Sequence, residues 1–171
     1  MKNTRHENLA EHSFECAVIA HALAVIGNTV YEGTFDEDKV ALYALYHDVS
    51  EIYTGDLPTP IKYYNPSIKK AYKDIELAAQ EKLLAILPEK FRGAYDGIVK
   101  EEASPEIIAL VKAADKLCAY IKCVNERLGG NTEFAAAEKS IWETIEIMDI
   151  PEVAYFVEYF LPAFGCNLDE L

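Results

Sequence analysis

The sequence lacks an excess of positive charge. Among its 171 residues, 16 are Lys or Arg and 29 are Asp or Glu, which gives a formal net charge of −13. This balance argues against a broad nucleic-acid-binding surface, which needs a basic face, and against attraction to an anionic membrane. A bound phosphate remains compatible with it, provided that a metal ion or a few local cations dominate at the site.

Cysteine pairs and long apolar runs are also missing. The four cysteines (Cys16, Cys118, Cys123 and Cys166) form no C-x-x-C pair, so we expect reduced thiols, most of them buried, in place of a disulfide framework. We see no signal-peptide pattern, and no stretch approaches the roughly 18 uninterrupted apolar residues of a membrane span. These features predict a soluble, cytoplasmic protein.

Hydrophobic residues make up 51% of the chain and recur mostly at helical spacing, with no stretch that alternates at period two. Cap residues, prolines and glycines divide this pattern into helices, with a loop expected over 54–60. The helices are expected at about 8–26, 36–53, 66–87, 89–99, 105–129, 132–148 and 151–161, the first of them ending at Gly27-Asn28. The length and the absence of a linker predict one all-α domain over 1–171, a compact helical bundle.

Two polar side chains, His47 and Asp48, interrupt the second expected helix. Its apolar residues predict that this helix is largely buried; they are Val40, Leu42, Leu45, Val49 and Ile52. Burying an imidazole beside a carboxylate is costly unless a proton, a partner or a metal compensates it. Glu51 lies four residues after His47, which places both side chains on one face of an uninterrupted helix. Glu51 would then lie close enough to a metal-bound water to act as its general acid or base.

The expected long helix carries a second polar interruption, at Asp115. Its stripe at spacings of three and four reads Ile108, Val111, Asp115, Cys118 and Lys122. A carboxylate at an apolar position needs a counter-charge, which a metal ion would provide. An ion pair with Lys112 or Lys116 is the alternative explanation.

A fourth candidate, His12, shares a face of the first helix with Cys16 and Ile19. A lone histidine in that position is more often a core residue, with its ring nitrogens hydrogen-bonded inside the protein, than a metal ligand. His21 falls on the opposite face, and His6 precedes the helix. The nitrogens of His12 and His47, with the carboxylates of Asp48 and Asp115, form a plausible ligand set for one hydrolytic divalent metal ion.

The order of these four residues on successive helices resembles the HD-domain metal-dependent phosphohydrolases. Surrounding motifs narrow the resemblance to the bacterial 5′-deoxynucleotidases, over essentially the whole chain. These motifs are ENLAEHS (7–13), YHDVSE (46–51), TGDLPTPIK (54–62), KAADKLCAY (112–120) and NLDE (167–170).

The resemblance implies a homodimeric enzyme that removes the 5′-phosphate from deoxyribonucleoside monophosphates. The family's metal ligands match His12, His47, Asp48 and Asp115. Its catalytic acid/base matches Glu51, while Asp48 can also orient the nucleophile. Substrate contacts are implied for His12, Asp48 and Asp56, the last on the sugar. The family works with cobalt, manganese or copper, and zinc and magnesium are alternatives for the single ion.

Other parts of the pattern are less specific. Lys62 is either a phosphate contact or a solvated lysine, and the 54–62 loop could be a simple connector. Glu101 and Glu102 fall where related chains approach the nucleotide. The aromatic residues near the end of the chain suit either the core or a dimer interface; they are Tyr155, Phe156, Tyr159, Phe160 and Phe164.

The resemblance also implies a further N-terminal segment of about twenty residues. In the family, that segment holds an arginine that orients the phosphate and a tryptophan that excludes a 2′-hydroxyl. The single tryptophan here, Trp142, lies in a late helix. We therefore expect that the sequence begins inside the family's usual length.

Two other functions share parts of this pattern. One is another HD phosphohydrolase, acting on deoxynucleoside triphosphates, cyclic nucleotides or guanosine tetraphosphate. The other is a non-catalytic module in which a metal staples the helices or the site senses a nucleotide. A structural site needs neither Glu51 nor Asp56, and triphosphates would need more cations. The sequence therefore favours a monophosphate substrate.

Overall fold

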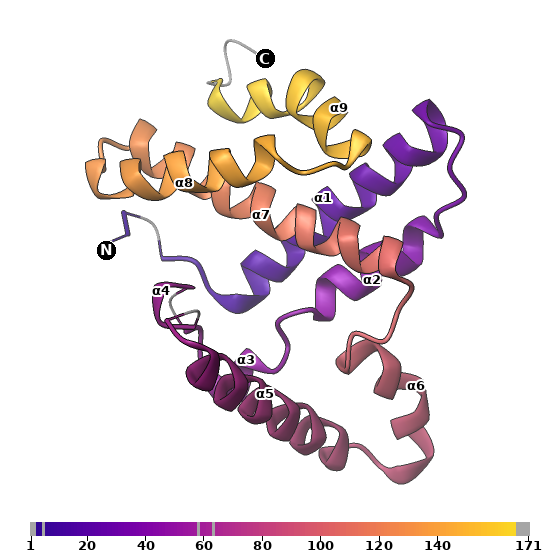
Figure 1. Cartoon of the computed structure of the whole chain (residues 1–171). Helices are drawn as coiled ribbons and strands as arrows, with labels where there is room; N and C mark the ends of the chain where they lie inside the picture. Colours follow the sequence, from indigo (N-terminus) through magenta and orange to yellow (C-terminus); the bar gives the residue numbers. More distant parts are fainter. Residues whose placement is uncertain (1–2, 5, 58, 63, 167–171) are drawn as a thin grey trace.

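The computed structural model describes residues 3–4, 6–57, 59–62 and 64–166. Within these ranges every regular element is helical, which confirms the all-α prediction (Figure 1). In chain order they are α1 (Leu9–Val30), α2 (Glu37–Tyr46), α3 (Glu51–Thr54), α4 (Thr59–Lys62), α5 (Pro66–Ile86), α6 (Glu89–Val99), α7 (Pro105–Leu128), the 3₁₀ turn η1 (Thr132–Phe134), α8 (Ala135–Glu146), α9 (Pro151–Tyr159) and the 3₁₀ turn η2 (Leu161–Gly165). The motif at 167–170 and Pro58 of the 54–62 motif lie outside the described residues.

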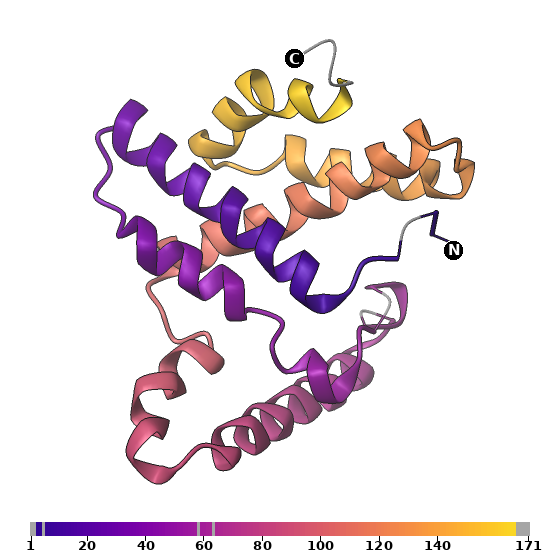
Figure 2. The ribbon, with the colours of Figure 1, turned by 180° about the vertical axis from the view of Figure 1, so that it is seen from behind.

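Three helices, α1, α2 and α7, form the centre of the fold. α1 packs against both of the others, and their fully buried side chains include Leu23, Val40 and Leu117. α8 packs on α7 and α9 packs on α1, so both lie on one side of the central three. α5 and α6 form an arm on the other side, as the front and back views show (Figures 1 and 2).

Among the described helices, α1 alone is long and apolar enough to cross a membrane by length and composition, with a mean hydropathy of 1.4 in its most apolar window. A core helix passes the same test. α1 is such a helix here, because Cys16, Ala20, Leu23 and Ala24 are completely buried against its neighbours.

Helix caps confirm several of the expected boundaries. Asn65 caps α5 through a 2.8 Å bond from the Ile68 amide, and Ser104 caps α7, each followed by a proline at the first helical position. These residues satisfy amide groups that have no partner inside the helix. Asp36 likewise caps α2.

The prediction that the first helix ends at Gly27-Asn28 is wrong, because α1 continues to Val30. Gly27 is a close-packing position: a Cβ there would lie 2.6 Å from the Phe35 ring and 3.0 Å from a carboxylate oxygen of Glu152. The Asn28 amide group bonds to both the backbone N–H and the C=O of Phe35, at 2.7 and 2.9 Å. The helix therefore extends while its side chains fix the following loop.

The expected helix over 36–53 is also wrong, because α2 ends at Tyr46 and the backbone turns over 47–50 before α3 begins. α2 buries only one face, so Leu42 and Leu45 are 39% and 43% exposed, and Ile52 on α3 is 64% exposed. Part of the expected loop is helical too: Thr59–Lys62 forms α4, with Pro60 in its first turn, where a missing N–H costs nothing.

Candidate metal centre and active site

His12 projects from the second turn of α1, and the start of this helix is fixed by a reciprocal cap. The Asn8 side chain accepts a 3.0 Å bond from the Glu11 amide, while the Glu11 carboxylate accepts a 3.0 Å bond from the Asn8 amide. This capping box leaves His12 one turn above the buried Cys16. The ring is therefore held on the face of α1 that meets α7.

His47 and Asp48 occupy the turn at the end of α2. The His47 Nδ1–H donates to the Ala44 carbonyl at 2.7 Å, one of the carbonyls that a helix end leaves unsatisfied. Since a carbonyl only accepts, this bond assigns the proton to Nδ1 and leaves Nε2 to face the neighbouring side chains. The turn places Asp48 beside that nitrogen.

Asp115 comes from the middle of α7, between the completely buried Ala114 and the buried Cys118. Its carboxylate lies at the junction of α1 and α7 and is about one-third exposed. The ion pair with Lys116 that offered an alternative explanation is present, at 3.3 Å, and it uses the oxygen Oδ2. The other oxygen, Oδ1, lies 3.5 Å from His12 Nε2, so the two explanations coexist.

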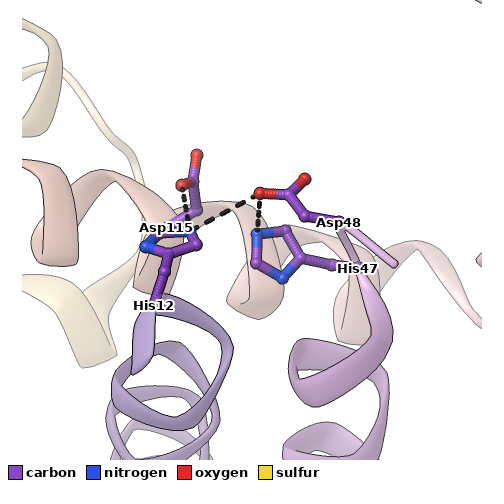
Figure 3. Close-up of side chains that lie close together, drawn as sticks. All are labelled: His12, His47, Asp48 and Asp115. Carbon is purple, nitrogen blue, oxygen red and sulfur yellow. Dashed lines mark ion pairs between the residues drawn. The ribbon is translucent and has the colours of Figure 1, made fainter. Parts of the chain in front are cut away.

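These four side chains converge on one point, as predicted. Figure 3 shows the two imidazoles and two carboxylates facing one another, and the four potential ligand atoms all lie within 4.8 Å of one another. Asp48 Oδ2 is 3.5 Å from His12 Nε2 and 3.1 Å from His47 Nε2. In each carboxylate the second oxygen points away from the rings.

The carboxylates set the charge state of the two histidines. Hydrogen bonds to Asp115 and then Asp48 raise the pKa of His12 to about 10, against the opposing effect of burial. Burial lowers the pKa of His47, but Asp48 outweighs it and the net direction is upward. Burial acts to raise the pKa of Asp48, yet the close approach of the His12 and His47 rings holds this pKa well below its usual range. The two carboxylates of the cluster therefore favour positive charge beside them, either on the histidine rings or on a bound cation.

The donor set fits a divalent metal ion. His47 Nε2 is buried and, within the part of the chain that the structure describes, has no well-aligned hydrogen-bond partner. Two imidazole nitrogens and two carboxylate oxygens suit Zn, Mn, Co or Cu, and the Nδ1–H bond to a carbonyl is the usual support of a histidine ligand. A cation at this point would replace the second proton that the His12 ring otherwise holds at neutral pH.

Glu51 lies next to this cluster but not within it. It begins α3, after the break, so the reasoning that placed it on one helix with His47 is wrong although the proximity is real. Burial, followed by the charges of Asp48 and Asp56, raises the pKa of Glu51 to about 7. A carboxyl group with that pKa can both hold and release a proton near neutral pH.

The loop after α3 brings Asp56 toward the same region. Asp56 is exposed, and its charge is one of those that raise the pKa of Glu51. Lys62 is also near enough to act on Glu51, in the opposite direction. Its ammonium group, however, pairs with Glu76 of α5 at 2.8 Å and lies 4.6 Å from the centre of the Tyr72 ring. The Lys62 side chain is therefore paired and not simply solvated.

Glu101 and Glu102 differ from each other. Glu101 has φ of 55°, an uncommon conformation for a residue with a side chain, and burial raises its pKa against the opposing charge of His47. Asp48 acts in the same direction as burial, so Glu101 is near enough to the cluster to feel the charge of two of its members. Glu102 contributes its backbone carbonyl, which accepts a 2.7 Å bond from the Tyr43 hydroxyl, while its side chain is exposed.

Tyr72 and Glu76 were not singled out from the sequence. Their spacing of four on α5 places them on one helix face, which could have indicated a shared contact. Nothing in the pattern indicated that this face would meet the 55–62 segment, because α5 contributes none of the four clustered groups.

Comparison with known proteins agrees with this geometry. Residues 1–164 match the family described as 5′-deoxynucleotidase YfbR-like. The 5′-deoxynucleotidase of Erwinia tasmaniensis is 47% identical over 172 residues, covering 100% of this chain and 87% of that protein. The 5′-deoxynucleotidase of Vibrio cholerae is 47% identical over 172 residues, covering 100% and 89%.

Two solved structures share the fold. An HD-domain phosphohydrolase from Listeria innocua superimposes with a TM-score of 0.81 at 22% identity, over 98% of this chain and 81% of that one. A protein from Pyrococcus horikoshii superimposes with a TM-score of 0.64 at 25% identity, over 95% and 84%. The arrangement of helices around the four-residue cluster is therefore shared with proteins of distant sequence.

Proposed function

The chain belongs to the YfbR-like 5′-deoxynucleotidase family, and from this membership and its site we propose that it is a metal-dependent phosphomonoesterase acting on 2′-deoxyribonucleoside 5′-monophosphates. The products are a nucleoside and phosphate. The observation that supports this most directly is the four-group cluster beside Glu51, a carboxyl group with a pKa near 7.

We assign His12, His47, Asp48 and Asp115 as the residues that hold one divalent cation. Such an ion supplies Lewis-acid chemistry, since it neutralises phosphate charge and acidifies a water molecule. The donor set suits cobalt, manganese or copper, which we propose as the working metals. His12 and Asp48 also border the place where the phosphate would lie.

Acidic residues in and near the metal site have further proposed roles. The second oxygen of Asp48 points away from the two rings, and we assign it to orient the attacking water. Glu51 holds a proton near neutral pH and passes it to the leaving 5′-oxygen. Asp56 accepts a hydrogen bond from the sugar, and Glu101 borders the same side of the cluster. We assign Lys62 to its pair with Glu76, from which its charge acts on Glu51, and we keep the exposed Glu102 as a proposed substrate contact beside Glu101.

A substrate panel tests the function. The purified protein, loaded with cobalt or manganese, is assayed for phosphate release from deoxy- and ribonucleoside 5′-monophosphates. We expect release from the deoxy series at a higher kcat/KM. Metal binding without turnover on any member would instead support a non-catalytic module.

The ligand assignment has a separate test. Asp115→Ala should lose bound metal and activity together, because it removes one oxygen from a four-group site. Lys116→Met, which removes the neighbouring cation but no ligand, is the matched control and should keep its metal. Unchanged metal content of Asp115→Ala by elemental analysis would remove Asp115 from the ligand set.

We further propose that the enzyme is cytoplasmic and homodimeric. An apolar groove between α1 and α2 supports the dimer. It is lined by Phe14, Val18, Leu42 and Leu45, all of them 39% exposed or more. A second copy of the chain would cover this surface. Phe160 and Phe164 near the C-terminus are a smaller exposed apolar area, whereas Phe156 belongs to the core.

A further inference from the structure

The residues that follow α3, from Gly55 to Leu57, form no regular element. Gly55 has φ of 67°, in the region that favours glycine, and donates to the Glu51 carbonyl at 2.9 Å. Among the described residues, apart from Gly55 and its chain neighbours, no atom lies within 4 Å of the place where a Cβ on Gly55 would be, and Asp56 is exposed. What fixes the Asp56 carboxylate must therefore come from a neighbouring element.

That element is α5, which contacts the segment at both ends. The buried Tyr72 donates its hydroxyl to the Gly55 carbonyl at 3.3 Å. At the other end, the Lys62 ammonium group lies 2.8 Å from Glu76 Oε1. Tyr72 and Glu76 are one turn apart, about 6 Å along the axis, so a single face of α5 holds the segment.

The Tyr72 side chain takes part in both contacts. Its hydroxyl bonds to Gly55, while the centre of its ring lies 4.6 Å from the Lys62 ammonium group. Cation–ring attraction and the Glu76 pair therefore restrain the same lysine. Both partners of the pair are about 30% exposed, and the pair is partly shielded from water. The two α5 side chains therefore hold Gly55 and Lys62, the two ends of the segment.

We propose that Tyr72 and Glu76 are positioning residues, which hold the 55–62 segment at its two ends and thereby place the Asp56 carboxylate for the nucleoside part of the substrate. This inference rests on the proposed function. By this inference α5, which supplies none of the four clustered groups, controls how the nucleoside is bound. The phosphate and metal part of the site depends on α1, α2 and α7 and is unaffected.

Steady-state kinetics of the metal-loaded enzyme test this. Tyr72→Phe and Glu76→Gln should each raise KM for a 2′-deoxynucleoside 5′-monophosphate by roughly three- to tenfold, the loss of one hydrogen bond, with kcat changed less than twofold. The inhibition constant of 2′-deoxyadenosine should rise in parallel, and that of inorganic phosphate should stay constant. Bound metal should be unchanged.

Two further variants make the test specific. Glu81→Gln removes an ion pair that α5 makes with Lys100, away from the segment, and should leave KM unchanged. Lys62→Met combined with Glu76→Gln should raise KM no more than Lys62→Met alone, because Lys62→Met already removes the pair with Glu76.

The outcomes separate this inference from the proposed function. Wild-type enzyme that releases no phosphate contradicts the function itself. Active wild type with unchanged KM in Tyr72→Phe and Glu76→Gln overturns the positioning role alone. Equal increases in the inhibition constants of 2′-deoxyadenosine and phosphate also overturn it, since they would indicate a general loosening of the site.

Discussion

The chemistry of the site depends on single residues whose charge is set by their neighbours. The Ala44 carbonyl directs the His47 Nε2 toward the cluster, and Asp48 contacts both histidines. Burial together with Asp48 and Asp56 raises the pKa of Glu51. At neutral pH, Asp48 is thus ionised and Glu51 is near its titration midpoint, although the two residues are close together. Different surroundings give the same functional group two different roles.

At this scale, Glu51→Gln should lower kcat by roughly 10²- to 10⁴-fold while bound metal is unchanged, because it removes a proton donor and no ligand. Glu143→Gln on α8 is the control.

In the metal-free protein the raised pKa of Glu51 also costs stability. The folded state keeps a proton on Glu51 that the unfolded state loses between about pH 4.5 and about pH 7. Unfolding free energy should fall with pH across that window, and less steeply in Glu51→Gln. Near-full activity of Glu51→Gln would exclude the acid/base role.

The histidines predict proton release on metal binding. With a pKa near 10, the His12 ring is charged at neutral pH in the metal-free protein, and it must become neutral to bind metal. The pKa of His47 is also raised, which favours the charged form of that ring. Titration calorimetry at pH 7 in buffers of different ionisation enthalpy should detect between roughly one and two protons released per metal. His21→Ala is the control variant. It changes a histidine on the far face of α1 and should release the same number of protons per metal ion as the wild type. Binding heats independent of the buffer would contradict the assignment.

At the scale of elements, two helix ends differ from the sequence prediction, and each has a structural consequence. α2 stops at Tyr46, so that His47 and Asp48 lie in a turn where their side chains need not follow helical spacing. α1 continues through Gly27, whose missing side chain lets Phe35 and Glu152 approach closely. The first departure positions ligands, and the second lets α9 pack against α1.

Gly27→Ala should therefore destabilise the protein by about 1–3 kcal/mol, since its Cβ would overlap the Phe35 ring. Gly93→Ala in the middle of α6 is the matched control. Nothing lies within 4 Å of its Cβ position, and alanine there should stabilise by about 0.5–1 kcal/mol. Urea unfolding followed by circular dichroism measures both. Equal stability of the two variants would show that α1 and its neighbours adjust without cost.

At the scale of the whole molecule, the central helices α1, α2 and α7 carry the metal site, and the α5–α6 arm approaches it from one side (Figure 1). The catalytic region is thus shared between a buried core and a less tightly packed arm. On the opposite face of α1, the groove that includes Phe14 and Leu42 leaves apolar surface exposed. That surface is distinct from the site, so assembly and catalysis can be tested separately.

Phe14→Asp should convert the proposed dimer to a monomer, because it places a charge on the lining of the apolar groove. Phe91→Asp is the control: Phe91 is 48% exposed on α6, outside the groove. Light scattering after size-exclusion chromatography gives the mass of each. Wild type eluting as a monomer, or Phe14→Asp remaining dimeric, would reject this interface.

The sequence by itself determined which residues could act and most helix boundaries. Periodicity and caps located α5, α6 and α7, and the polar interruptions at His47, Asp48 and Asp115 identified the cluster. These signals are local: a cap or an apolar stripe needs only its neighbours in the chain. The motifs around them indicated the family.

Tertiary structure decided the rest. The break after Tyr46, the extension of α1 past Gly27 and the exposure of Leu42 depend on which faces other helices cover, and the sequence pattern does not state this. The contacts of Tyr72 and Glu76 with the 55–62 segment likewise join residues whose meeting depends on how α5 packs. Burial and long-range contacts, which no local pattern contains, determined how the residues named by the sequence are held.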